Sequence, residues 1–137
     1  MKLEELKVYQ LAMSIAEELW DIVYKWDYFA KNTVGKQLVK AADSIAANLS
    51  EGFGRFFYKE GKRFCYYSRC SLYETKTWLT KANNRKLITT EKFEKFQKEI
   101  NNIGVRLNNY IASIGKKNPM WDQVQLNDSE ANDGEAQ

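Results

Sequence analysis

Polar side chains that could perform acid–base chemistry lie on two segments of the sequence. The polar residues are Asn48, Glu51 and Arg55 on the first segment and Ser71 and Glu74 on the second. Gly52 lies next to Glu51 and belongs to the same motif. Glu51 and Glu74 can act as a general acid and a general base if the fold pairs them. Neither carboxylate has a nucleophile or metal ligands beside it, so the catalytic pattern is weak. The alternative is a structural motif, in which Glu51 pairs with Arg55 and the other polar groups satisfy one another and fix the helix register. The sequence predicts the structural motif and no catalytic residue.

A basic row with interleaved tyrosines is the second chemical pattern. Its members advance by three and four residues along one helical face: Lys59, Lys62, Tyr66, Arg69, Tyr73 and Lys76. The row lies opposite the predicted core face of its helix, which includes Phe64 and Tyr67. Cationic side chains neutralise phosphates and aromatic faces stack on unpaired bases, as a surface for single-stranded or structured RNA requires. A solvated helix face and a subunit contact are the alternatives. In those cases the next candidates for nucleic acid are Lys92, Lys95, Lys98 and Arg106.

Composition argues against several kinds of site. The 137 residues contain no histidine, which removes the commonest zinc ligand and the usual general base near neutral pH. Cys65 and Cys70 are five residues apart on one predicted helix, so they point in different directions and cannot form a disulfide bond. We therefore expect a non-enzymatic protein in a reducing compartment, with no cofactor, metal or small-molecule substrate.

Four apolar periodicities predict the elements that position these residues. The expected helices span residues 3–28, 34–52, 59–82 and 90–114. We expect Asn32 or Thr33 to cap the second helix, Thr89 or Thr90 to cap the fourth, and Gly115 to end it. Because the connections are short, sequential helices are antiparallel. The predicted fold is all-α, an antiparallel up-down-up-down four-helix bundle.

The first predicted helix has two apolar faces. One face contains Tyr9, Ala12, Ala16, Leu19, Val23 and Trp26, and the other, turned by about 100°, contains Val8, Leu11, Ile15 and Ile22. A helix that is apolar on two faces must bury both of them. With the first face in the core of the bundle, the second is expected to contact another copy of the chain, which predicts a homo-oligomer.

Charge divides the chain into residues 1–117 and residues 118–137. The first region holds all 21 Lys and Arg and all but five of the 18 acidic residues, so it carries a net charge of +8 and the second carries −5. The second region has few large apolar side chains, and we expect a disordered acidic tail after a single bundle domain. We find no signal-peptide pattern and no apolar run of about 18 residues, so we expect a cytoplasmic protein without a membrane partner.

The chain resembles the bacterial four helix bundle protein family at two stretches, KAADSIAANLSEGFGR (40–55) and RFCYYSRCSLYET (63–75). The matching positions are Ala41, Ala42, Ser44, Ile45, Asn48, Glu51, Gly52, Arg55, Phe64, Ser71 and Glu74. The family's usual Arg, Ala and Gly are replaced here by Lys40, Ser68 and Cys70. The family includes proteins encoded in 23S rRNA intervening sequences and accessory variability proteins of diversity-generating retroelements. The resemblance implies a homopentamer with a basic surface, which in the retroelement branch binds nucleic acid and a reverse transcriptase.

Two functions remain open from the sequence. The first is an oligomeric nucleic-acid-binding protein or reverse-transcriptase accessory adaptor. The second is a self-associating structural scaffold whose basic face only keeps it soluble. An enzyme is disfavoured. The salt dependence of RNA and DNA binding separates the first two functions, because each phosphate contact makes that dependence steeper.

Overall fold

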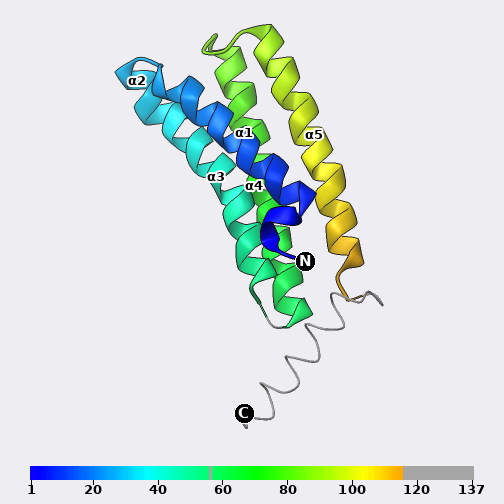
Figure 1. Cartoon of the computed structure of the whole chain (residues 1–137). Helices are drawn as coiled ribbons and strands as arrows, with labels where there is room; N and C mark the ends of the chain where they lie inside the picture. Colours follow the sequence, from blue (N-terminus) through cyan, green and yellow to red (C-terminus); the bar gives the residue numbers. More distant parts are fainter. Residues whose placement is uncertain (56, 116–137) are drawn as a thin grey trace.

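The computed structural model describes residues 1–55 and 57–115, which fold into four long helices (Figure 1). These are α1 (Lys7–Tyr24), α3 (Lys36–Phe53), α4 (Tyr58–Asn84) and α5 (Thr90–Ser113), and a 3-10 turn (Leu3–Glu5) precedes α1. One helical turn, α2 (Tyr28–Ala30), and a π turn (Lys31–Gly35) lead directly into α3. The predicted all-α four-helix bundle is confirmed. The predicted acidic tail, residues 118–137, lies outside the described residues.

Each long helix packs against two others, in the order α1, α3, α4, α5 and back to α1. Figure 1 shows the four helices side by side, with α1 and α3 on one side of the bundle and α5 on the other. The core between them contains large, fully buried side chains: Ile15, Leu19, Leu38, Ile45, Leu49, Leu79, Phe96, Ile103 and Leu107. Every helix therefore has two buried flanks, and this decides which apolar side chains are left at the surface.

Helix α1 lies at a corner of this arrangement, which changes the interpretation of its second apolar face. Val8 and Ile15, predicted to contact another copy, are only 2% and 1% exposed within the chain's own core. Leu11 and Ile22, the other members of that face, are half-buried beside α5. A corner helix buries one apolar face against α3 and the other against α5. The prediction that this face is left free for a partner is therefore wrong, and oligomerisation stays a prediction without it.

The second predicted helix begins earlier than expected. Its cap is Asp27, whose side chain accepts a hydrogen bond from the backbone N–H of Ala30 at 3.0 Å. Asn32 and Thr33, the predicted caps, lie inside the helical run and donate to backbone carbonyls four residues earlier. Helix α1 ends at Tyr24, before this cap, and does not continue to residue 28. The prediction of both boundaries was wrong.

Small residues bring α3 and α4 close together. A Cβ added to Gly52 would lie 2.8 Å from the carbonyl oxygen of Gly61, so the two backbones touch at this point. Further along, the buried Ser68 hydroxyl donates to the carbonyl of Ile45 at 2.7 Å. From the first contact to the second, the chain moves seven residues back along α3 and seven residues forward along α4. The two contacts therefore define one antiparallel register along the two helices.

Helix α5 begins and ends as predicted. The Thr89 hydroxyl accepts a hydrogen bond from the backbone N–H of Lys92 at 3.2 Å, which caps the first turn. Gly115 follows the helix with a φ of 86°, a left-handed conformation that suits glycine. The fourth helix therefore has the limits expected from its capping residues.

Candidate nucleic-acid interface

The predicted basic row lies on α4, and all six of its side chains reach solvent. Lys59, Tyr66 and Tyr73 are exposed, whereas Lys62, Arg69 and Lys76 are half-buried. The buried row of α4 is Gly61, Cys65, Ser68, Leu72, Thr75 and Leu79, so five of the six basic-row members directly follow a core residue. One residue turns a helix by about 100°, which places the row on the flank of α4 that faces α5. The prediction that it lies opposite the core is wrong. We name these six residues the α4 strip.

Arg69 makes two contacts at the centre of the α4 strip. Its guanidinium carbon lies 4.8 Å from the centroid of the Tyr66 ring, in cation–π geometry. Its Nη1 atom donates a hydrogen bond to the side-chain oxygen of Asn108 on α5 at 3.1 Å. A guanidinium group has five N–H donors, so this bond leaves further donors for phosphate oxygens. The two contacts hold the charge at the surface in one position.

A groove of about 320 Å³ continues the α4 strip toward α5. Tyr73 and Lys76 form its α4 side, and Asn101, Val105 and Asn108 are on its α5 side. Val105 is 60% exposed, so the groove offers apolar as well as amide groups. Amide side chains can contact phosphates and base edges. No local sequence pattern indicates these α5 residues, because only the packing of α4 against α5 brings them beside the strip.

The predicted core face of the third helix is partly wrong. Tyr67 is 47% exposed and packs edge to face against Phe64, with 5.4 Å between the ring centroids. The guanidinium of Arg55 lies 4.7 Å from the Phe64 centroid. Cys65 and Leu72 occupy the core instead, and burial raises the pKa of the Cys65 thiol to about 12, which makes it unreactive. The helix has aromatic residues on both flanks of its core row, so periodicity alone did not distinguish them.

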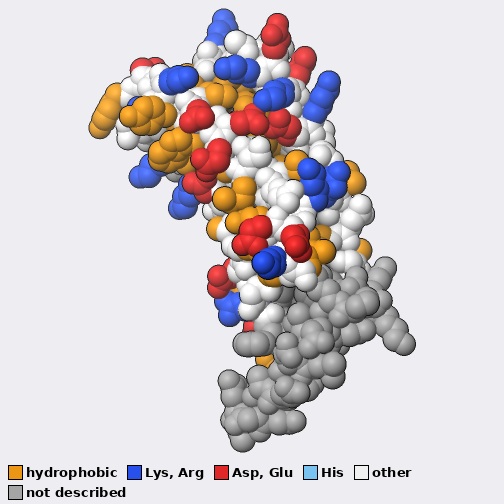
Figure 2. All heavy atoms as spheres, viewed as in Figure 1, with side chains coloured by type: hydrophobic (Ala, Val, Ile, Leu, Met, Phe, Trp, Pro, Cys, Tyr) orange, Lys and Arg blue, Asp and Glu red, His pale blue; other side chains and the backbone are white. Residues whose placement is uncertain are grey.

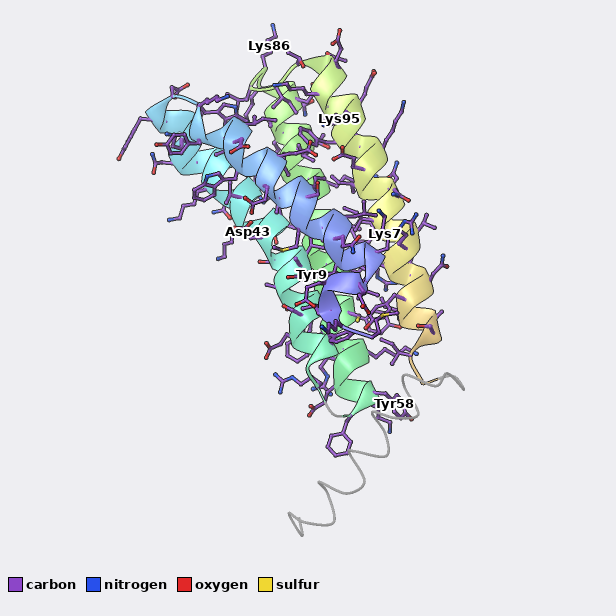
Figure 3. The ribbon with its side chains drawn as sticks, viewed as in Figure 1. Lys7, Tyr9, Asp43, Tyr58, Lys86 and Lys95 are labelled. Carbon is purple, nitrogen blue, oxygen red and sulfur yellow. The ribbon has the colours of Figure 1, made fainter. Side chains whose placement is uncertain are left out.

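The alternative basic set on α5 differs from the α4 strip in having one member, Lys95, in ion pairs. Its members, Lys92, Lys95, Lys98 and Arg106, are all exposed. Lys95 lies on α5 (Figure 3). Its Nζ atom lies 2.6 Å from the Glu18 carboxylate and 3.6 Å from that of Glu99. The hydrogen bond with Glu18 raises the pKa of Lys95. Within the described part of the chain no ion pair involves the α4 strip, whereas Lys95 is the one member of the α5 set that is held in ion pairs.

The first half of the structural motif forms local contacts on α3. Glu51 and Arg55 pair across 2.8 Å, as predicted, but both are substantially exposed. The side-chain amide of Asn48 donates to the carbonyl of Ser44 on the preceding turn. Surface ion pairs of this kind contribute little to stability. On α3 the residue of the motif that packs most closely is therefore Gly52, which contacts α4 directly.

The second half of the motif does not join the first. Glu74 is exposed and accepts a hydrogen bond from the indole N–H of Trp78 at 3.5 Å, whereas Ser71 is buried. In the α3–α4 register, Glu51 is level with Lys62, which is twelve residues from Glu74. At 1.5 Å per residue the two carboxylates are separated by about 18 Å along the bundle. The predicted polar cluster across the helices is therefore wrong, and these carboxylates do not form a pair.

The described part of the chain holds no group of three His, Cys, Asp or Glu side chains that could bind a metal ion. No helix in the same residues has the length and apolar character needed to cross a bilayer.

Comparison with known proteins identifies the family. The family model described as 23S rRNA-intervening sequence protein matches residues 4–109 of the 137-residue chain. This range contains α1, α3, α4, the α4 strip and most of α5. No curated protein matches the chain. Because the match covers well over half of the sequence, the chain belongs to the 23S rRNA-intervening sequence protein family.

Proposed function

We propose that this chain is a non-enzymatic, oligomeric nucleic-acid-binding protein whose α4 strip contacts phosphates and unpaired bases. The observation that carries the proposal is the Arg69 guanidinium held over the Tyr66 ring in the middle of an exposed basic strip. A cation–π contact at an exposed site contributes about 0.5–1 kcal/mol, which keeps the guanidinium in place before a ligand arrives. The family is named for intervening sequences in 23S rRNA, so RNA is the first ligand to test.

The chemistry of the α4 strip favours single strands over duplexes. Tyr73 is 64% exposed and Tyr66 is 41% exposed, so both rings can accept an unpaired base. Stacking of a base on an aromatic side chain contributes about 1–3 kcal/mol and tolerates any base. In a duplex the bases are already stacked on one another, and only the phosphates remain available. We therefore expect broad sequence tolerance and tighter binding to single-stranded RNA than to duplex RNA.

The proposal is tested by replacing both Lys62 and Arg69 with Gln and measuring RNA affinity against salt concentration. Each phosphate contact contributes about 0.7 to the slope of log K against log salt for single strands. Loss of two contacts should therefore shrink the slope by about 1.4 and weaken binding almost equally across sequences. A Tyr73→Ala variant should weaken binding to single strands and leave duplex binding nearly unchanged.

A matched control separates the α4 strip from net charge. Lys92→Gln combined with Lys98→Gln removes the same charge from exposed positions on α5. If both double variants lose affinity equally, the strip has no special role and only overall charge attracts the nucleic acid. If the unmodified protein binds neither RNA nor DNA at low salt, the structural scaffold is the correct function. Circular dichroism of each variant verifies that the bundle is retained.

The resemblance extends the proposal to assembly and partners. It implies a homopentamer and, in one branch of similar proteins, a reverse transcriptase partner that would make this chain an accessory adaptor. Light scattering gives the particle mass directly, and a homopentamer corresponds to five times the 16.0 kDa of one chain. A monomer at micromolar concentration contradicts this part of the proposal without affecting nucleic-acid binding by the α4 strip.

A further inference from the structure

A slot with apolar walls and a lysine rim lies between the C-terminal half of α1 and the N-terminal half of α3. Its volume is about 280 Å³. Its apolar walls include Trp20, Tyr24 and Val39, and its lysines are Lys31, Lys36 and Lys40. Figure 2 shows hydrophobic side chains gathered at the α2 end of the molecule, with basic side chains next to them. We name this feature the α1–α3 slot.

The local packing explains why the α1–α3 slot exists. A Cβ added to Gly35 would lie 2.6 Å from a methyl group of Val23, so α1 touches the end of the π turn that leads into α3 at the floor of the slot. The larger side chains above this contact remain open to solvent, and Trp20 is 49% and Tyr24 66% exposed. The ammonium group of Lys31 lies 4.6 Å from the centroid of the Tyr24 ring. The slot is therefore preformed, and one of its cations already lies against an aromatic wall.

These properties define the chemistry of an occupant. Burying apolar surface contributes about 25 cal/mol per Å², and an aromatic side chain buries about 150–250 Å². The three lysines add a preference for carboxylates beside that side chain. The slot thus suits a large aromatic residue within an acidic segment. An uncharged apolar segment would gain nothing from the lysine rim.

The chain itself contains such a segment beyond the described residues. Trp121 is followed directly by Asp122, and residues 118–137 carry five acidic side chains and no basic one. Tryptophan is among the residues that contribute most to binding when it enters a pocket. The indole matches the apolar walls of the α1–α3 slot, and the carboxylates match its lysine rim.

The length of the chain disfavours docking of Trp121 in the slot of its own molecule. Gly115, the last described residue, lies against the Tyr58 ring at the start of α4. In the α3–α4 register, Tyr58 is level with Arg55, and Val39 in the slot is sixteen residues farther, or about 24 Å along the bundle. Six extended residues span at most about 22 Å, and the path must also pass around the helices. A second copy can present Trp121 to the slot without this constraint.

We propose that the acidic segment around Trp121 of one copy docks in the α1–α3 slot of a second copy. The indole ring enters between Trp20 and Val39, and neighbouring carboxylates face Lys36 and Lys40. This contact is independent of the α4 strip, which lies on the opposite side of the bundle between α4 and α5. It gives the bundle's copies a connection that does not require Val8, Leu11, Ile15 and Ile22 to be left free.

Photo-crosslinking in the full-length chain tests this proposal. Trp121 is replaced by the photoreactive amino acid p-benzoylphenylalanine, which keeps an aromatic side chain at that position. The modified chain is mixed with a ¹⁵N-labelled unmodified chain, and the two are refolded together before irradiation. Mass spectrometry then locates the crosslinks. We expect them to join the light residue 121 to heavy peptides that contain Trp20, Tyr24 or Val39.

Charge reversal on the acceptor chain provides the matched control. Lys36→Glu combined with Lys40→Glu should reduce these crosslinks at least fivefold, because the rim then repels the acidic segment. Lys92→Glu combined with Lys98→Glu makes the same charge change outside the slot and should leave the yield within twofold of the unmodified chain. Both pairs are exposed, so the fold is expected to remain intact.

Three outcomes overturn the proposal. The first is the absence of crosslinks to the slot, or their location elsewhere on the bundle. The second is crosslinking only within light chains, which would show that the segment stays with its own molecule. The third is an equal loss of crosslinks in both charge-reversal variants. If the slot variant instead loses more RNA affinity than Lys92→Glu combined with Lys98→Glu while crosslinks to the slot are absent, a nucleobase occupies the slot.

Discussion

Gly52 and Gly61 decide how closely α3 and α4 approach. A Cβ on Gly52 would lie 2.8 Å from the carbonyl oxygen of Gly61, and one on Gly61 would lie 3.0 Å from that of Gly52. Neither neighbour is a flexible side chain that can move aside, because both are backbone atoms held inside helices. The glycine of the sequence motif therefore has a packing role, and this role is separate from the exposed ion pair next to it.

We predict that Gly52→Ala destabilises the protein despite the higher helix propensity of alanine. Alanine gains about 1 kcal/mol in a helix interior, but forcing α3 from α4 costs about 1–3 kcal/mol. Gly104→Ala is the control, because its Cβ would meet only the Leu72 side chain at 3.4 Å. Urea unfolding should show a net loss for Gly52→Ala and no loss, or a gain, for Gly104→Ala. Equal effects at both positions would contradict the close approach.

Asp43 introduces a pH dependence. It lies on α3 in a groove against α1 (Figure 3), and its pKa is raised first by burial and second by the charge of Glu17. The folded protein thus binds this proton more tightly than the unfolded chain does. The contribution of Asp43 to stability is fully present below its unfolded pKa and is lost as the pH rises through the folded pKa. At neutral pH the ionised carboxylate is a cost to the fold.

We predict that Asp43→Asn raises the free energy of unfolding at pH 7 and that this gain shrinks toward pH 3.5. The carboxyl group destabilises the fold only when it is charged. An amide cannot ionise, so the variant avoids this destabilisation at pH 7. Glu17→Gln removes the second cause and should give a smaller gain in the same direction. Urea unfolding at the two pH values measures both variants. A gain for Asp43→Asn that is independent of pH would show that its raised pKa does not explain the effect.

The positions of the helices along the chain could be predicted better than the faces through which the helices contact one another. The spacing of Phe96, Ile100, Ile103 and Leu107 defined α5 correctly, because an amphipathic helix with one core row has only one way to face a bundle. α1 and α4 have apolar residues on more than one face, and their neighbours decide which faces are buried. Ile15 was therefore assigned to a partner although it is in the core. Tyr67 was assigned to the core although it is exposed.

The corner position of α1 leads to a prediction about its two apolar faces. Ile15 is fully buried and Leu11 is half-buried beside α5. Truncating a buried Ile to Ala costs about 2–5 kcal/mol, and a partly exposed side chain loses less buried surface. In urea unfolding, Ile15→Ala should therefore cost at least twice as much as Leu11→Ala. If Ile15→Ala kept its stability and only reduced the particle mass in light scattering, the original assignment to a subunit contact would be right.

The candidate site was predictable in its residues and not in its surroundings. The α4 strip could be identified because Lys and Tyr recur at helical spacing within one element. The contact of Arg69 with Asn108 joins residues 39 positions apart, and no local pattern indicates it. The same holds for the α1–α3 slot, which depends on Gly35 meeting Val23 across two helices. Periodicity assigns residues to faces, and only packing shows which faces meet.

The distribution of charge along the whole chain bears on the nucleic-acid binding that we propose. Residues 1–117 carry a net +8, and the five acidic residues beyond them carry −5. At low salt these opposite charges attract each other and compete with phosphates for the same cations. The Debye length is about 10 Å at 0.1 M salt and about 3 Å at 1 M, so the competition fades as salt increases.

We predict that neutralising the acidic residues tightens RNA binding at low salt. The variant replaces each of the five acids with its amide, Asp122→Asn, Asp128→Asn, Glu130→Gln, Asp133→Asn and Glu135→Gln, and keeps the full chain length. Its affinity should exceed that of the unmodified chain at 50 mM salt and converge with it near 0.5 M, because screening removes the competition. Trp121→Ala retains the −5 charge and should leave RNA affinity unchanged, although it removes the indole proposed for the α1–α3 slot. Filter binding at several salt concentrations measures all three proteins. An equal affinity gain in Trp121→Ala would mean that docking of the segment, and not its charge, restricts access to the α4 strip.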